Sequence, residues 1–205
     1  MMFSHRAPLR MLAFALLLTV ASQLFYITVV SEAGSDTVLR PITWFTELFA
    51  FLAVAVAGLT LAICKPQQGM IWPLVALSGV FNVLQVAIGL SMFGPALEGA
   101  EAEPQLFATV LAGAFFLYFL AKLMLGGVGI VLGAAAIRLP TLVAKVVGGL
   151  TLLSGLAALI LNFLAMIDSK AWMFAAGASG TGATALLAIL LLVTGNATTA
   201  DDASA

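Results

Sequence analysis

The sequence predicts an all-α polytopic membrane protein, built as a bundle of about six transmembrane helices. Hydrophobic residues make up 63% of the 205 residues and charged residues only 8%, whereas a soluble domain carries about 25% charged residues. Apolar segments also recur along the chain at the length that a helix needs to cross a bilayer, which is about 20 residues. Together these observations exclude an ordinary soluble domain.

Six apolar segments account for most of the chain, and each is long enough to span a bilayer. They cover residues 11–30, 42–64, 70–93, 106–137, 141–167 and 171–194. Arg6 and Arg10 precede the first segment as they would in a signal peptide, but its apolar run is too long for one. We therefore expect an uncleaved first helix, a single transmembrane domain over residues 1–197 and a short disordered polar tail over 198–205.

The charges are distributed unequally between the two sides of the predicted bundle. One side collects five basic residues, Arg6, Arg10, Lys65, Arg138 and Lys145. The other side holds two, Arg40 and Lys170, together with Glu32, Asp36, Glu98, Glu101, Glu103 and Asp168. The positive-inside rule then places both termini in the cytoplasm. With short loops and an Ala, Leu and Gly bias, the chain resembles a bacterial protein of the inner (plasma) membrane.

Composition also excludes several kinds of site. Cys64 is the only cysteine and His5 the only histidine, so we expect no disulfide within the chain, no bis-histidine haem, no metal site and no cofactor. The chain has no basic stripe for nucleic acid. It has no nucleotide-binding or hydrolase motif in a supporting context, so we do not expect an enzyme.

Polar and small residues recur at steps of three and four within each segment and so lie on one helix face. The clearest stripes are Ser78, Asn82, Gln85 and Gly89; Ala114, Tyr118, Lys122, Gly126, Gly129 and Gly133; and Gly177, Thr181, Thr184 and Ala188. For Gly, Ala, Ser and Thr, we expect helix packing, which in membranes uses small residues and weak interhelical hydrogen bonds. Phe116 and Phe119 lie opposite the Lys122 stripe, and we expect both to face lipid.

Glu47 and Lys122 are harder to explain by packing, because an ionisable side chain inside a bilayer is costly unless it is paired or faces a cavity. We hypothesise a polar pocket in the outer half of the bundle. Its predicted ligand-binding members are Gln23, Tyr26, Glu47, Asn82, Gln85, Tyr118, Lys122 and Asn162. A Glu47–Lys122 ion pair is geometrically allowed. The alternatives are a neutralised pair that only fixes helix register, and a Glu47 that reaches interfacial water.

Three function classes remain. The first is binding or transport of a small solute or ion through the pocket, and the second is a non-catalytic membrane subunit or scaffold of a larger complex. The third is an intramembrane enzyme, which lacks an evident catalytic set. We favour the first. The expected partners are therefore the lipid bilayer, a small solute or ion, and other membrane subunits or a second copy of the chain.

The order of several short motifs resembles an uncharacterised family of small bacterial multi-pass membrane proteins, a family built on a domain of unknown function. The motifs are Thr46-Glu47-Leu48-Phe49, Gly126-Gly127-Val128-Gly129, Arg138-Leu139-Pro140 and Gly148-Gly149. The resemblance spans most of the chain. It implies about six helices and no known activity.

Overall fold

The computed structural model describes residues 6–33 and 37–202, with side chains as far as residue 195. Its helices are α1 (Arg6–Phe25), the π-helical turn η1 (Tyr26–Val30), α2 (Leu39–Cys64), the short 3₁₀ turn η2 (Pro66–Gln68), α3 (Ile71–Gly99), α4 (Gln105–Ala136), α5 (Leu142–Ile167) and α6 (Ser169–Asp202). Six of these segments, with η1 counted as part of the first, are long and apolar enough to cross a membrane. The predicted all-helical architecture is therefore confirmed, and the described residues contain no strand.

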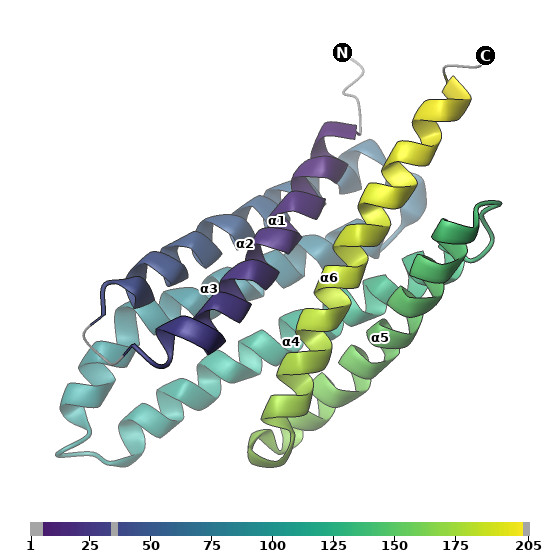
Figure 1. Cartoon of the computed structure of the whole chain (residues 1–205). Helices are drawn as coiled ribbons and strands as arrows, with labels where there is room; N and C mark the ends of the chain where they lie inside the picture. Colours follow the sequence, from purple (N-terminus) through teal and green to yellow (C-terminus); the bar gives the residue numbers. More distant parts are fainter. Residues whose placement is uncertain (1–5, 34–36, 203–205) are drawn as a thin grey trace.

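The six long helices run up and down and form a closed arrangement (Figure 1). Each helix packs on the next one in the chain, α6 packs back on α1, and α4 also contacts α6. The start of α1 and the end of α6 lie at the same end of the bundle, which we call the terminal end. The turns η1 to α2, α3 to α4 and α5 to α6 lie at the opposite end.

The helix bounds differ from the sequence prediction at two places. Helix α3 continues to Gly99 with Pro95 inside it, although we expected the chain to leave the helix at residue 94. Inside a helix, proline removes one backbone hydrogen bond and its ring crowds the carbonyl of the preceding turn, yet α3 continues through Pro95. Helix α6 continues to Asp202, into the segment predicted to be a disordered tail. Residues 203–205, like the predicted loop acid Asp36, lie outside the described residues.

Glycines hold α4 against α5 at very short range. A Cβ atom placed on Gly133 would lie 2.6 Å from the backbone oxygen of Gly148, and one placed on Gly126 would lie 2.8 Å from that of Gly155. The contacts are reciprocal, because a Cβ on Gly148 would lie 2.9 Å from the oxygen of Gly133. Only a residue without a side chain allows backbones to approach this closely.

A large apolar cluster fills the bundle on the side of the terminal end. We call it the apolar layer; it includes Leu12, Leu16, Val54, Leu61, Val75, Leu125, Val128 and Leu187. These residues come from the first part of α1 and α3 and the last part of α2, α4 and α6. The half of the bundle nearer the opposite end is less completely filled.

Candidate ligand-binding pocket

A cavity of about 810 Å³ lies in that less filled half. Residues of α1, η1, α2, α3, α4 and α6 line it, and most of the lining is apolar. Its polar lining residues are Gln23, Tyr26, Glu47, Gln85, Tyr118 and Thr181. All but Thr181 belong to the group predicted from the sequence, so the fold does bring together residues from four separate helices around one space.

Lys122 does not line this cavity itself; it contacts two residues that do, Gln23 and Tyr118, and it is completely buried, with 0% of its surface exposed. Its Nζ donates to Gln23 Oε1 at 3.3 Å and to Thr184 Oγ1 at 3.3 Å. The same Nζ lies 5.4 Å from the centre of the Tyr118 ring, which is within the range of a cation–π interaction. The ammonium is therefore surrounded by neutral polar groups.

Gln23 joins Lys122 to the pocket surface. Its Oε1 accepts a hydrogen bond from Thr181 Oγ1 at 3.0 Å in addition to the one from Lys122. Thr184 also donates to the backbone oxygen of Gly180 at 2.7 Å. Together, Gln23, Lys122, Thr181 and Thr184 form a connected polar group from α1, α4 and α6, which we call the lysine cluster.

Gly180 provides the space for the lysine stem. A Cβ atom on Gly180 would lie 2.9 Å from Lys122 Cγ, 3.0 Å from Cβ and 3.1 Å from Cδ. The aliphatic part of the lysine thus lies flat against the backbone of α6. Any larger residue at position 180 would push this stem away from α6 and move its ammonium.

Glu47 is the second ionisable group at the pocket, with 8% of its surface exposed. Its carboxylate lies within electrostatic range of the Lys122 ammonium. Among the described residues, however, Lys122 hydrogen-bonds only to neutral side chains and forms no direct ion pair with Glu47. Opposite charges at short range stabilise each other strongly where water is excluded, so the two groups are coupled without touching.

Aromatic rings build the wall of the pocket nearest the opposite end. Tyr26 stacks on Trp44 with ring centres 6.2 Å apart, and Trp44 meets the edge of Phe93 at 5.7 Å. Tyr26 begins the π-helical turn η1, in which its carbonyl accepts from the N–H of Ser31 at 2.9 Å. Single π-helical turns occur frequently at functional sites.

Exposed lining residues mark the mouth of the pocket. Leu24 and Ile27, from α1 and η1, are 52% and 64% exposed, and Phe174 from α6 is 89% exposed. The pocket therefore opens sideways, between the end of the first membrane-length helix and the start of the last. In a bilayer such an opening would face lipid rather than water.

Three of the predicted members do not line the cavity: Lys122, which contacts the lining from behind, and two asparagines that lie farther away. Asn82 is completely buried and donates to the backbone oxygen of Ser78 at 3.0 Å. Asn162, also completely buried, donates to the oxygens of Ala158 at 2.8 Å and Ala176 at 3.3 Å. Neither lines the cavity. The sequence analysis expected both side chains to point into the pocket, and they point elsewhere.

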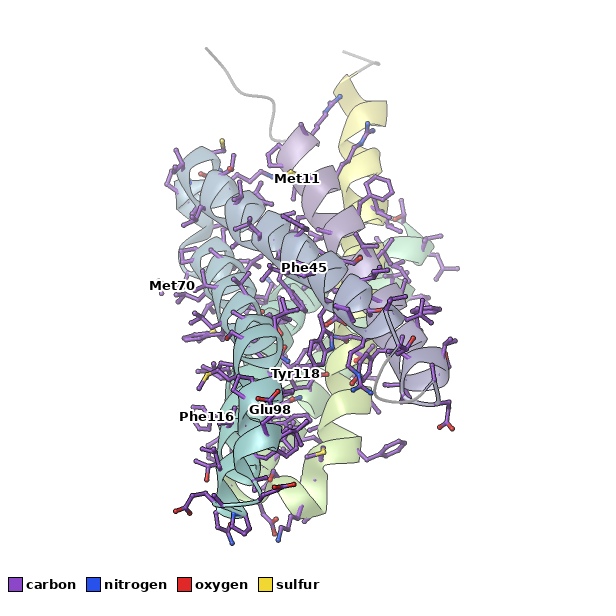
Figure 2. All side chains as sticks on the ribbon, turned by 90° about the vertical axis from the view of Figure 1, so that its left-hand side faces the viewer. Met11, Phe45, Met70, Glu98, Phe116 and Tyr118 are labelled. Carbon is purple, nitrogen blue, oxygen red and sulfur yellow. The ribbon has the colours of Figure 1, made fainter. Side chains whose placement is uncertain are left out.

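The prediction for the two phenylalanines was right for one and wrong for the other. Phe116 is 47% exposed and lies at the outer edge of the bundle, whereas Tyr118 lies between the helices (Figure 2). Phe119 is only 1% exposed; its ring stacks on Phe115 with centres 5.8 Å apart. Because α4 contacts α3, α5 and α6, little of its circumference is left to face lipid.

The sequence analysis did not assign Thr181, Thr184 or Gly180 to the pocket. Both threonines were recognised in the polar stripe of the last segment, but a threonine at helical spacing usually reflects packing. The useful signal was the combination of two threonines one turn apart with a glycine beside them. In the part of the chain that the structure describes, no group of three or more His, Cys, Asp or Glu residues is placed to hold a metal ion.

No protein-family model matches the chain, and no curated protein or solved structure matches it either. The resemblance to the uncharacterised family therefore stays a prediction.

Proposed function

We propose that this chain is a multi-pass protein of the inner membrane that binds a small amphiphilic solute in the pocket. The apolar part of the solute lies against the leucine, phenylalanine and tyrosine side chains of the lining. Its polar group lies at the lysine cluster and Glu47. With both termini in the cytoplasm, as the positive-inside rule favours, the pocket lies in the outer half of the bilayer.

One observation carries this proposal: Lys122 is buried directly behind the lining residue Gln23, and its ammonium has only neutral direct partners. Burying a cation costs free energy that neutral hydrogen bonds recover only in part. A polar or anionic group of a solute in the pocket would supply the missing interaction. An ion pair that served only to fix helix register would place Glu47 in direct contact with Lys122.

The sideways mouth supports an amphiphilic solute over a bare ion. Leu24, Ile27 and Phe174 provide an apolar entrance at membrane depth. A hydrated ion would have to lose its water there without compensation. A molecule that partitions into the bilayer can enter along this path.

The scaffold alternative receives less support from the small residues. A protein that assembles through its helix faces would carry its glycine stripe outward, whereas Gly126, Gly133, Gly148 and Gly155 lie inside, between α4 and α5. The enzyme alternative has no acid pair near Lys122. The scaffold alternative predicts that the content of the pocket does not matter for assembly.

The proposal is tested by native mass spectrometry of protein extracted gently from its own membrane. We expect a stoichiometric small molecule that is retained by the natural protein and lost from Lys122→Met, which keeps the stem and removes the charge. A protein partner of fixed stoichiometry together with an empty pocket would favour the scaffold. Retention of the same molecule by Lys122→Met would overturn the role of the lysine.

A pocket-filling variant gives an independent test. Gly177 lines the pocket, and a Cβ atom on it would meet nothing within 4 Å, so Gly177→Leu fills the space and leaves the lysine cluster unchanged. Gly113→Leu is the matched control, because Gly113 also has open space around it but lies outside the pocket. We expect the bound molecule to disappear from the first variant and to remain in the second.

A further inference from the structure

A second cavity, of about 480 Å³, lies at the terminal end of the bundle. It is separated from the pocket by the apolar layer. Residues of α1, η2, α3, α4 and α6, together with Lys65, line it. Its lining includes three basic residues, Arg6, Arg10 and Lys65, and no acidic residue among the side chains that the structure describes, which end at residue 195.

The cations converge from distant parts of the sequence. Arg6 and Arg10 lie on the first turns of α1, and Lys65 caps the end of α2. Placing the charges of Arg10 and Lys65 at one cavity costs free energy through repulsion, and an anion between them would offset that cost. Basic cavities between the ends of membrane helices are suited to the phosphate groups of lipids.

Gln68 and Trp72 form a polar part of the cavity wall, which we call the polar floor. A hydrogen bond between them fixes the orientation of the Gln68 side chain. The indole N–H of Trp72 donates to Gln68 Oε1 at 2.6 Å, and Trp72 is only 2% exposed. Because the Gln68 oxygen is occupied by this bond, its NH₂ group is what the side chain offers to the cavity. The polar floor therefore presents a further hydrogen-bond donor to an anion.

Leucines form the rest of the wall. Leu9 on α1, Leu132 on α4 and Leu190 to Leu192 on α6 line the same cavity. A free inorganic anion would leave this apolar surface in contact with water. A phospholipid can place its phosphate among the cations and its glycerol and first acyl carbons against the leucines.

We propose that this cavity binds the headgroup of an anionic phospholipid from the leaflet at the terminal end. Arg10 and Lys65 provide the charge, Gln68 provides a directed N–H, and the leucines receive the start of an acyl chain. This site is separate from the pocket that we propose binds an amphiphilic solute, and the lipid proposal does not depend on that function. Its expected ligand is a lipid with a net negative phosphate headgroup, such as phosphatidylglycerol.

The test is a lipid titration of the full-length protein in detergent, followed by native mass spectrometry. Phosphatidylglycerol is compared with phosphatidylcholine of the same acyl chains. We expect one phosphatidylglycerol to be retained with clear preference, and its affinity to fall about fivefold for each charge removed by Arg10→Gln and Lys65→Gln. Arg10→Lys keeps the charge and should keep most of the affinity.

Arg138→Gln and Lys145→Gln form the matched control. Both residues lie at the same end of the bundle and are exposed, and neither lines the cavity. The control removes the same charge from the same surface, so it should leave the preference for phosphatidylglycerol unchanged. An equal loss in both pairs would show nonspecific attraction to basic surface and would overturn the proposal.

A second arm distinguishes a lipid from a free phosphate. Inorganic phosphate at millimolar concentration is added to the lipid-bound protein, with chloride at equal ionic strength as its control. We expect phosphate to displace no more lipid than chloride does. Displacement by phosphate alone would assign the cavity to a soluble phosphate group. Should Lys65→Gln fail to fold, Arg10→Gln decides the question, because the Arg10 side chain is exposed.

Discussion

The two halves of α4 use the same spacing of residues for opposite purposes. Near the terminal end, Gly126 and Gly133 bring the backbone of α4 into contact with that of α5 and leave no space. Toward the opposite end, Tyr118 lines a cavity of about 810 Å³, and Lys122 lies behind that lining, hydrogen-bonded to Gln23. A single stripe at steps of three and four therefore forms a close helix contact at one end and a polar site at the other.

This difference shows what a small residue does in each half. Gly133 is small so that two helices can touch, whereas Gly180 is small so that a long charged side chain can lie against a helix. The first use stabilises the bundle directly through van der Waals packing. The second stabilises only the position of the Lys122 ammonium. The following substitutions separate these two roles.

The largest effect is expected for Gly133→Val. Its Cβ would lie 2.6 Å from the Gly148 oxygen and 2.7 Å from the Leu152 nitrogen, and backbone atoms cannot move away as a side chain can. We expect a loss of about 3 kcal/mol of stability, at the upper end for overpacked cores, measured by thermal unfolding in detergent. Gly127→Val is the control, because a Cβ there meets nothing within 4 Å. Equal stability of the two variants would refute the close contact.

A smaller effect is expected from the electrostatic coupling across the pocket. Glu47→Gln and Lys122→Met, made singly and together, form a double-mutant cycle. Because the two charges lie within range of each other, we expect a coupling of about 1.5 kcal/mol, within the usual span for interacting groups. Stability is measured by reversible unfolding in mixed micelles. Additive single effects would mean that each group is stabilised independently.

The smallest effect is expected for Gly180→Ala. The new methyl group meets only the flexible stem of Lys122, at 2.9 Å to 3.1 Å, so the cost should be about 1 kcal/mol. In a Lys122→Ala background Cγ and Cδ are absent and only the contact with Cβ at 3.0 Å remains, so the same substitution should cost much less. An undiminished cost in that background would show that Gly180 contacts something other than the lysine.

The fold was predictable from the sequence because the length and hydropathy of a segment are enough to identify a membrane-spanning helix. All six segments were found, but the third was ended at residue 93 and its helix continues to Gly99, and the last was ended at residue 194 and its helix continues to Asp202. Pro95 lies inside the first of these extensions, where its ring removes a hydrogen bond and crowds the preceding turn without ending the helix. The orientation of the bundle in the membrane remains a prediction from the distribution of Lys and Arg.

The candidate site was predictable only in part. The sequence predicted correctly that Gln23, Glu47 and Lys122 lie near one another. Helical spacing and the position of each residue along its helix indicate which polar groups lie at the same height in the bundle; we call this height a level. Asn82 and Asn162 were expected at that level too, but their side chains bond to backbone oxygens of neighbouring turns and helices. Which face of a helix meets which neighbour depends on the packing of all six, and the periodicity of one helix does not contain that information.

The apolar layer has a consequence for movement across the membrane. Leu16, Leu125 and Leu187 are buried in it, between the pocket and the terminal end. Exposing three such side chains to water costs roughly 5–9 kcal/mol, at about 1.5–3 kcal/mol each. A carrier would have to recover that energy by binding its cargo, or a coupled ion, more tightly in an inward-open conformation than in this one. A receptor for a bilayer-borne molecule needs no second conformation, since its cargo enters and leaves on the same side.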